Sequence, residues 1–239
     1  GEVKAEIGDL PLLGHIPYVD FFKGVREDKR FLLQELDNET KTDTSETERK
    51  AARYQRFFYQ EAFRNLFTSL RFLNSDRPLR SIAMTSSLPA EGKSLVNTLL
   101  AKTLAEMGQR VLLIDADLRK PQLHARLGLN NLRGLSKLLT DDSNHWRQAL
   151  QTIAGYEGWS VITAGRRPPD PTRLLSSKRM HRLVEELGNS GEFDLILFDT
   201  PPVLGLADAA LVAEHCDGLM LLVSLDRVDR SLPKEAVHR

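Results

Sequence analysis

The chain has 239 residues, with 33 Lys and Arg against 33 Asp and Glu and a hydrophobic fraction of 41%. That length and composition suit one large soluble domain with a substantial core. The balanced charge gives no general attraction to nucleic acid or anionic lipid, and no apolar run reaches the about 18 residues of a membrane span. A single cysteine, Cys216, excludes an intrachain disulfide and is expected to be a buried apolar residue rather than a reactive thiol.

Residues 1–80 differ in pattern from the rest and are predicted to form an N-terminal extension. Leu10–Pro17 is short, apolar and bounded by prolines, which favours an edge strand. Asp37–Lys50 is almost entirely polar and is expected to be a solvated loop. Ala51–Leu73 is predicted to be an amphipathic helix, because its apolar side chains recur at helical spacing: Tyr54, Phe58, Ala62, Phe63, Leu66, Phe67 and Leu70. The apolar face of that helix needs a partner surface.

Residues 81–239 alternate strand and helix signals and are predicted to be a second unit. Short apolar runs predict strands at Ser81–Thr85, Arg110–Asp115, Trp159–Thr163, Phe193–Asp199 and Gly218–Ser224. Helices are predicted at Lys93–Met107, Leu135–Leu139, Asn144–Ile153, Lys178–Leu187 and Asp208–Glu214. This order predicts an α/β fold with a mostly parallel central sheet and helices on both faces. In such sheets the ligand lies at the carboxyl ends of the strands.

A Gly-Lys-Ser loop joins the first predicted strand to the first helix. Backbone N–H groups at such a helix start can hold phosphate, Lys93 would reach the β- and γ-phosphates, and Ser94 would bind Mg²⁺. Ser87 stands where the common pattern has glycine, so a structural turn is the alternative. With this strand–loop–helix context we expect a P-loop NTPase-like fold and nucleotide contacts from Pro89, Ala90, Glu91, Gly92, Lys93, Ser94 and Leu95.

Two acidic motifs end later strands. Asp115 and Asp117 follow the second strand, and at that spacing the two carboxylates would repel each other without a cation or Lys93 nearby. Asp199 ends an apolar strand in the manner of a Walker-B acid that binds Mg²⁺ directly or through water. The alternatives are a polar turn for the first motif and a turn cap for Asp199. The order of the three motifs favours one shared site.

The three motifs together resemble the cytoplasmic catalytic domain of bacterial tyrosine kinases that control export of capsular polysaccharide and exopolysaccharide. Further similar segments are Leu118–His124, Gly128-Leu129, Gly134–Leu139 and Ala164–Pro171 with Leu174-Leu175, the last segment having Asp170 in place of the family's Asn. Leu10–Pro17 and Glu61–Arg64 resemble the family's N-terminal entry. The resemblance covers nearly the whole chain except the polar loop and the last dozen residues.

The resemblance implies transfer of phosphate from ATP to tyrosine with Mg²⁺ as cofactor, mostly onto the tyrosine-rich tail of a neighbouring subunit. It implies catalytic roles for Lys93, Asp115, Asp117 and Asp199, and metal binding by Ser94, Asp115 and Asp199. Asp115 would accept or orient the phenol proton. It also implies oligomerisation through Glu61 and Arg64, a membrane-spanning polysaccharide co-polymerase partner, no nucleic-acid partner, and a place on the cytoplasmic face of the bacterial inner membrane.

Three departures from the family pattern keep alternatives open. Phe67 stands where the oligomerisation motif has its last arginine, none of the four tyrosines forms a C-terminal cluster, and the chain ends at Arg239, before the strand expected to contact adenine. One alternative is a nucleotide-binding regulatory module without kinase activity. Another is a partitioning-type ATPase, although Leu88 stands where such proteins carry a second lysine. Arg119 could meet either an incoming tyrosine or a subunit partner.

Overall fold

The structure, a computed structural model, describes residue 46 and residues 60–68, 79–86, 90–202 and 206–222. Its sheet has six strands in the order β3-β4-β2-β5-β1-β6. Five of them run parallel: β1 (Ser81–Ser86), β2 (Val111–Asp115), β4 (Tyr156–Ile162), β5 (Leu195–Asp199) and β6 (Gly218–Leu222). The sixth, β3 (Gln151–Ile153), pairs antiparallel with β4 at the edge. The predicted mostly parallel sheet is therefore confirmed.

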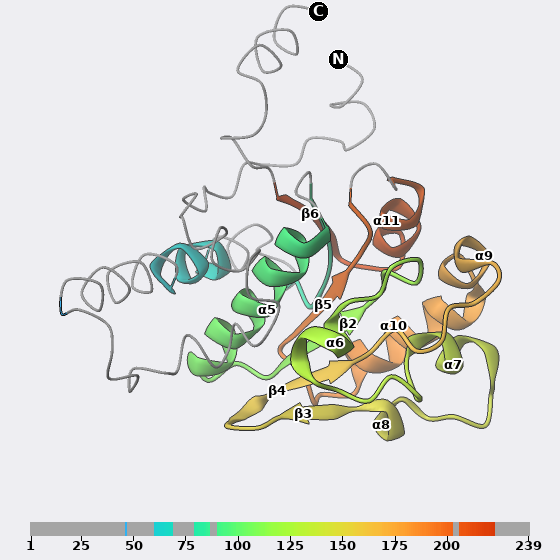
Figure 1. The fold of residues 1–239 in the computed structure, drawn as a ribbon, viewed down its shortest axis with the longest axis horizontal. Helices are drawn as coiled ribbons and strands as arrows, with labels where there is room; N and C mark the ends of the chain where they lie inside the picture. Colours follow the sequence, from blue (N-terminus) through green and yellow to red (C-terminus); the bar gives the residue numbers. More distant parts are fainter. Residues whose placement is uncertain (1–45, 47–59, 69–78, 87–89, 203–205, 223–239) are drawn as a thin grey trace, which may run out of the picture.

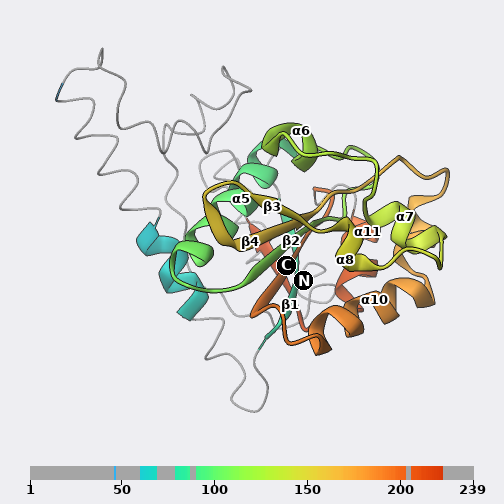
Figure 2. The same ribbon diagram turned by 90° about the horizontal axis from the view of Figure 1, so that it is seen from below.

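Helices cover both faces of this sheet (Figures 1 and 2). The long helix α5 (Ala90–Glu106) lies on one face together with α6 (Leu123–Leu127). The other face carries α7 (Leu135–Thr140), α8 (Trp146–Ala149), α9 (Pro171–Leu175), α10 (Lys178–Asn189) and α11 (Leu206–Ala213). No helix among the described residues is long and apolar enough to cross a membrane.

Alternate residues of the central strands enter two separate hydrophobic clusters. Leu113 of β2 packs in the cluster on the α5 face, whereas its neighbours Leu112 and Ile114 pack on the opposite face. Every residue of β1, β2 and β5 is buried. A strand covered on both faces needs apolar side chains at consecutive positions, which explains the unbroken apolar runs in the sequence.

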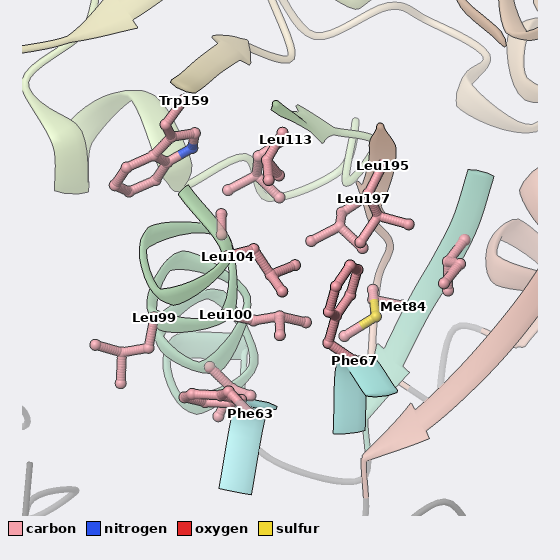
Figure 3. Packing of buried hydrophobic residues seen from close by; sticks show 14 of the residues in the cluster. Phe63, Phe67, Met84, Leu99, Leu100, Leu104, Leu113, Trp159, Leu195 and Leu197 are labelled. Carbon is pink, nitrogen blue, oxygen red and sulfur yellow. The ribbon is translucent and has the colours of Figure 1, made fainter. Parts of the chain in front are cut away.

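The helical segment at residues 60–68 packs against α5. Phe63, Leu66 and Phe67 are buried in the same cluster as Leu99 and Leu100 of α5 (Figure 3). The surface that the amphipathic helix needs is therefore provided, over this segment, by its own chain. The rest of that predicted helix, the edge strand at Leu10–Pro17 and most of the polar loop lie outside the described residues.

One predicted helix is wrong in its second half. Asn144–Ile153 was expected to be helical, but α8 ends at Ala149 and Gln151–Ile153 forms β3. Gly155 has φ 86° in the turn that joins β3 to β4, where Ile153 pairs with Tyr156. A positive φ beside the β-branched residues Thr152 and Ile153 favours a hairpin over a continued helix. The short helices α6 and α9 were not predicted.

Candidate nucleotide and phosphoryl-transfer site

Helix α5 begins at the carboxyl end of β1, where the sequence predicts the phosphate loop. Ala90, Glu91 and Gly92 form the first helical residues, and Pro89 lies outside the described residues. The first N–H groups of a helix lack partners within the helix and attract anions. The Leu95 side chain packs in the hydrophobic core, so any phosphate contact from this residue would come from its backbone.

Lys93 is buried among carboxylates, with 1% of its surface exposed. Its ammonium group donates hydrogen bonds to Asp199 Oδ1 and to the backbone oxygen of Thr200. Asp117 Oδ2 lies 4.0 Å from the same ammonium group. The predicted relationship between Lys93 and the two acidic motifs is thus present, although here Lys93 is turned toward the end of β5.

Asp199 receives two further side-chain donors from α5. Ser94 Oγ lies 3.2 Å from Asp199 Oδ2, and Asn97 Nδ2 lies 2.9 Å from Asp199 Oδ1. Sequence reasoning missed Asn97. No signal in the sequence singles it out, because Thr98, Lys102 and Thr103 are also buried polar residues on α5.

Asp115 and Asp199 are direct partners in the parallel pairing of β2 with β5. The Asp115 carboxylate accepts backbone N–H bonds from Asp117 at 3.1 Å, Gln122 at 3.3 Å and Leu123 at 3.2 Å. Burial, and secondarily the charge of Asp199, raises the pKa of Asp115 to about 8, against a lowering by Lys93. A carboxyl group with a pKa near neutrality can accept and return a proton at physiological pH.

Asp117 shapes the loop that follows β2. It accepts backbone N–H bonds from Arg119 at 3.3 Å and from Lys120 at 3.1 Å through the same oxygen, Oδ1. Burial raises the pKa of Asp117, while those backbone bonds and Lys93 act in the opposite direction. Its other oxygen, Oδ2, faces Lys93. The sequence therefore brings Lys93, Ser94 and the three predicted acids to one edge of the sheet.

Ser94 and Asp199 fit a magnesium site whose coordination shell is completed by other ligands. Ser94 Oγ and Asp199 Oδ2, 3.2 Å apart, are close to the about 2.9 Å expected between adjacent oxygens of an octahedron with about 2.0 Å bonds. Within the described ranges no group of three or more His, Cys, Asp or Glu side chains could hold a metal. Mg²⁺ commonly uses one or two carboxylates with phosphate and water oxygens, so this smaller set suffices.

The predicted oligomerisation residues lie on the helical segment at residues 60–68. Arg64 Nη1 is 3.1 Å from Glu61 Oε1, and both side chains are about half exposed. The buried face of this segment, by contrast, is used against α5. Glu61 and Arg64 thus remain on the surface rather than joining the carboxylate site.

Comparison with known proteins identifies the family. Residues 79–224 match a family model described as an AAA domain. Tyrosine-protein kinase YwqD of Bacillus subtilis is 39% identical over 176 residues, which cover 74% of this chain and 73% of that protein. The chain belongs to the bacterial tyrosine-kinase family. Its resemblance to that family, inferred from the motifs, is confirmed.

Other members of the bacterial tyrosine-kinase family agree. The putative tyrosine-protein kinase CapB of Staphylococcus aureus is 32% identical over 74% of this chain and 75% of its own length. Longer relatives also match: tyrosine-protein kinase wzc of Salmonella typhimurium is 39% identical over 69% of this chain, but the match spans only 22% of wzc.

Solved structures of bacterial tyrosine kinases share the fold. The kinase domain of Escherichia coli tyrosine kinase ETK has a TM-score of 0.66 and 33% identity, covering 76% of this chain and 69% of that one. The BceF tyrosine kinase domain has a TM-score of 0.69 and 28% identity, covering 99% and 89%. The expected P-loop NTPase-like α/β fold is confirmed.

Proposed function

We propose that this chain transfers the γ-phosphate of ATP to tyrosine in an autokinase that regulates capsular polysaccharide or exopolysaccharide synthesis and export. The observation that carries the proposal is the convergence of Lys93, Ser94 and three carboxylates at the carboxyl edge of β1, β2 and β5. Relatives covered over most of their length are named tyrosine-protein kinases. The family and the site chemistry therefore support the same activity.

Each group has a role that its position supports. Lys93 leaves Asp199 and donates to the β- and γ-phosphates, and the N–H groups at the start of α5 hold the remaining oxygens. Ser94 and Asp199 would hold Mg²⁺, which would neutralise phosphate charge when bound. Asp117, whose Oδ2 lies 4.0 Å from the Lys93 ammonium group, attracts Lys93 and keeps it close to the site. The nucleotide contacts predicted for residues 89–92 and 95 belong to the same proposal.

Asp115 is the proposed proton acceptor. The phenol oxygen of tyrosine forms a bond to the γ-phosphorus as the bond from that phosphorus to the β,γ-bridging oxygen breaks, and ADP leaves. Asp115 takes the phenol proton. Its buried position raises its pKa to about 8, so its ionised form is a stronger base than an ordinary carboxylate. Because phosphoryl transfer depends mainly on positioning and charge neutralisation, these few groups are sufficient.

The partners and place in the cell follow from the same proposal. Residues 81–239 form the ATP-binding unit, and residues 1–80 form an extension that brings copies together through the exposed Glu61 and Arg64. The substrate is a tyrosine-rich tail, and the membrane-spanning co-polymerase part keeps the unit at the cytoplasmic face of the inner membrane. Relatives in which this unit accounts for only 22% of the protein are consistent with such an attachment.

The test is transfer of radiolabelled phosphate from ATP to a supplied tyrosine-rich peptide, measured beside ATP hydrolysis. Wild-type protein labels the peptide, whereas Lys93→Met and Asp115→Asn do not. Glu157→Gln is the matched control for the carboxyl-to-amide change, because Glu157 is exposed on β4, away from the site. Hydrolysis without peptide labelling would favour a partitioning-type ATPase. Nucleotide binding with neither reaction would favour a regulatory module without kinase activity.

A further inference from the structure

Asn97 is a buried polar residue in direct contact with the acid at the end of β5. Its side chain is fully buried on α5, and Nδ2 lies 2.9 Å from Asp199 Oδ1. The orientation of the amide is fixed by chemistry, since an ionised carboxylate beside Lys93 accepts hydrogen bonds and only the NH₂ group of the amide can donate them. Asn97 therefore supplies a directed donor to Asp199.

The amide is a poor choice for stability alone. Asn97 Oδ1 is buried and has no hydrogen-bond partner in the described part of the chain. A buried acceptor without a partner is unfavourable, and an apolar side chain would avoid this penalty on a helix packed in the core. The contact with Asp199 is the evident gain that the asparagine brings.

Asp199 Oδ1 is shared between Asn97 and Lys93 in this structure. In the proposed reaction Lys93 turns to the phosphates, and Oδ1 loses that donor. Asn97 lies on the same helix as Ser94 and is fully buried, so its donor stays in place. With Oδ1 held by Asn97, the other oxygen, Oδ2, remains directed at Ser94 Oγ, 3.2 Å away.

We infer that Asn97 is a positioning residue that fixes Asp199 for Mg²⁺ once Lys93 has moved to the nucleotide. This inference rests on the proposed function. Hydrogen-bond partners of metal ligands typically change metal affinity or activity by about 10–100-fold when mutated. The effect should therefore fall on the metal and spare nucleotide affinity measured without metal.

The experiment titrates Mg²⁺ into the full chain with mant-ADP, a fluorescent ADP analogue, at fixed concentration. In Asn97→Ala the Mg²⁺ concentration that gives half-maximal enhancement of mant-ADP binding should rise about 10–100-fold. The affinity for mant-ADP in EDTA should stay within about twofold of the wild-type value, which is the scatter of such titrations. Asn97→Leu, which keeps the branched shape and the number of side-chain heavy atoms but has no donor, is measured alongside, so the result does not depend on the folding of one variant.

Thr98→Val is the matched control. Thr98 is also buried on α5, but its hydroxyl donates to the backbone oxygen of Ser94 at 2.7 Å, and no contact with Asp199 is recorded among the described residues. It should keep the wild-type Mg²⁺ dependence. An unchanged Mg²⁺ midpoint in both Asn97 variants, or an equal rise in Thr98→Val, overturns the inference while leaving the proposed function standing. Wild-type protein that shows no Mg²⁺-dependent binding of mant-ADP overturns both.

Discussion

Arg119, in the loop after β2, binds Asp208 in the first turn of α11. Arg119 Nε lies 2.5 Å from Asp208 Oδ2, and Nη2 lies 3.2 Å from Oδ1. Asp208 is almost completely buried in the first turn of α11, whereas the Arg119 side chain is about half exposed. Thr172 of α9 also accepts a hydrogen bond from Nη2, at 2.9 Å. The arginine thus joins the loop that carries Asp117 to α9 and α11.

Arg119→Ala should destabilise the protein by about 1–3 kcal/mol, because it leaves the buried Asp208 without its charged donor. The loss is measured as the free energy of unfolding in urea. In a double-mutant cycle with Asp208→Asn, the two losses should be less than additive, since both substitutions remove the same contact. Additive losses would mean that the contact between Arg119 and Asp208 does not contribute to the free energy of unfolding. Arg133→Ala, on an exposed residue away from the pair, is the control.

The Arg119–Asp208 pair also shows how much of the site could be predicted from the sequence. The motif containing Asp115 and Asp117 predicted that Arg119 lies beside the acidic site, and the sequence suggested an incoming tyrosine or a subunit partner as its contact. In the structure Arg119 instead binds Asp208 of its own chain. Asp208 lies 89 residues further along. Its pairing depends on how the first turn of α11 sits against the loop after β2, which no local pattern encodes.

Local patterns were enough where burial is uniform. The unbroken apolar runs of β1, β2 and β5 predict those strands because both of their faces are covered. They were insufficient at the sheet edge, where β3 is short and half-exposed and its residues continue a helical pattern. Asn97 was missed for a related reason, since only the packing of α5 against β5 brings its amide to Asp199.

Lys93→Met should lower the stability of the nucleotide-free protein as well as abolish phosphate transfer. Lys93 and Asp199 are both 1% exposed, and removing one partner of a buried pair typically costs about 3–5 kcal/mol. We expect the lower end, because Ser94 and Asn97 still donate to Asp199. Lys93→Met combined with Asp199→Asn should recover part of the loss. Thermal unfolding of the three proteins checks this, and a single variant as stable as wild type would contradict it.

Without nucleotide, the free energy of unfolding should decrease as the pH rises, because Asp115 titrates. Its pKa is raised to about 8 by burial, from an ordinary value of 3.8. The folded state therefore holds a proton that the unfolded chain releases, so this contribution is fully present below about pH 4 and is lost as the pH rises toward 8. Asp115→Asn should flatten that decline by more than about 1.4 kcal/mol, the equivalent of one pKa unit.

The Asp115 measurement is the slope of the unfolding free energy between pH 5 and about 8.5, a window that spans the raised pKa of about 8. Slope is the readout because the substitution also alters the hydrogen bonds that Asp115 accepts from backbone N–H groups. Glu157→Gln, the exposed carboxyl-to-amide control, should keep the wild-type slope. Parallel curves for Asp115→Asn and wild type would show that Asp115 is ionised throughout in the folded protein.

Cys216 should react very slowly with thiol reagents in the folded protein. It follows α11 and is only partly buried, not fully buried as the sequence suggested, but this burial still raises the pKa of its thiol to about 12, with a further rise from the charge of Asp217. At pH 8 the thiolate fraction is then on the order of 10³-fold lower than for an ordinary thiol, and the thiolate is the reactive form. Because Cys216 is the only cysteine in the chain, absorbance after addition of Ellman's reagent reports this site alone. The same protein unfolded in guanidinium should react fully and rapidly. A reaction rate in the native protein within about tenfold of the unfolded rate, the equivalent of one pKa unit, would contradict the prediction, because it would show that the thiol is accessible and ionisable.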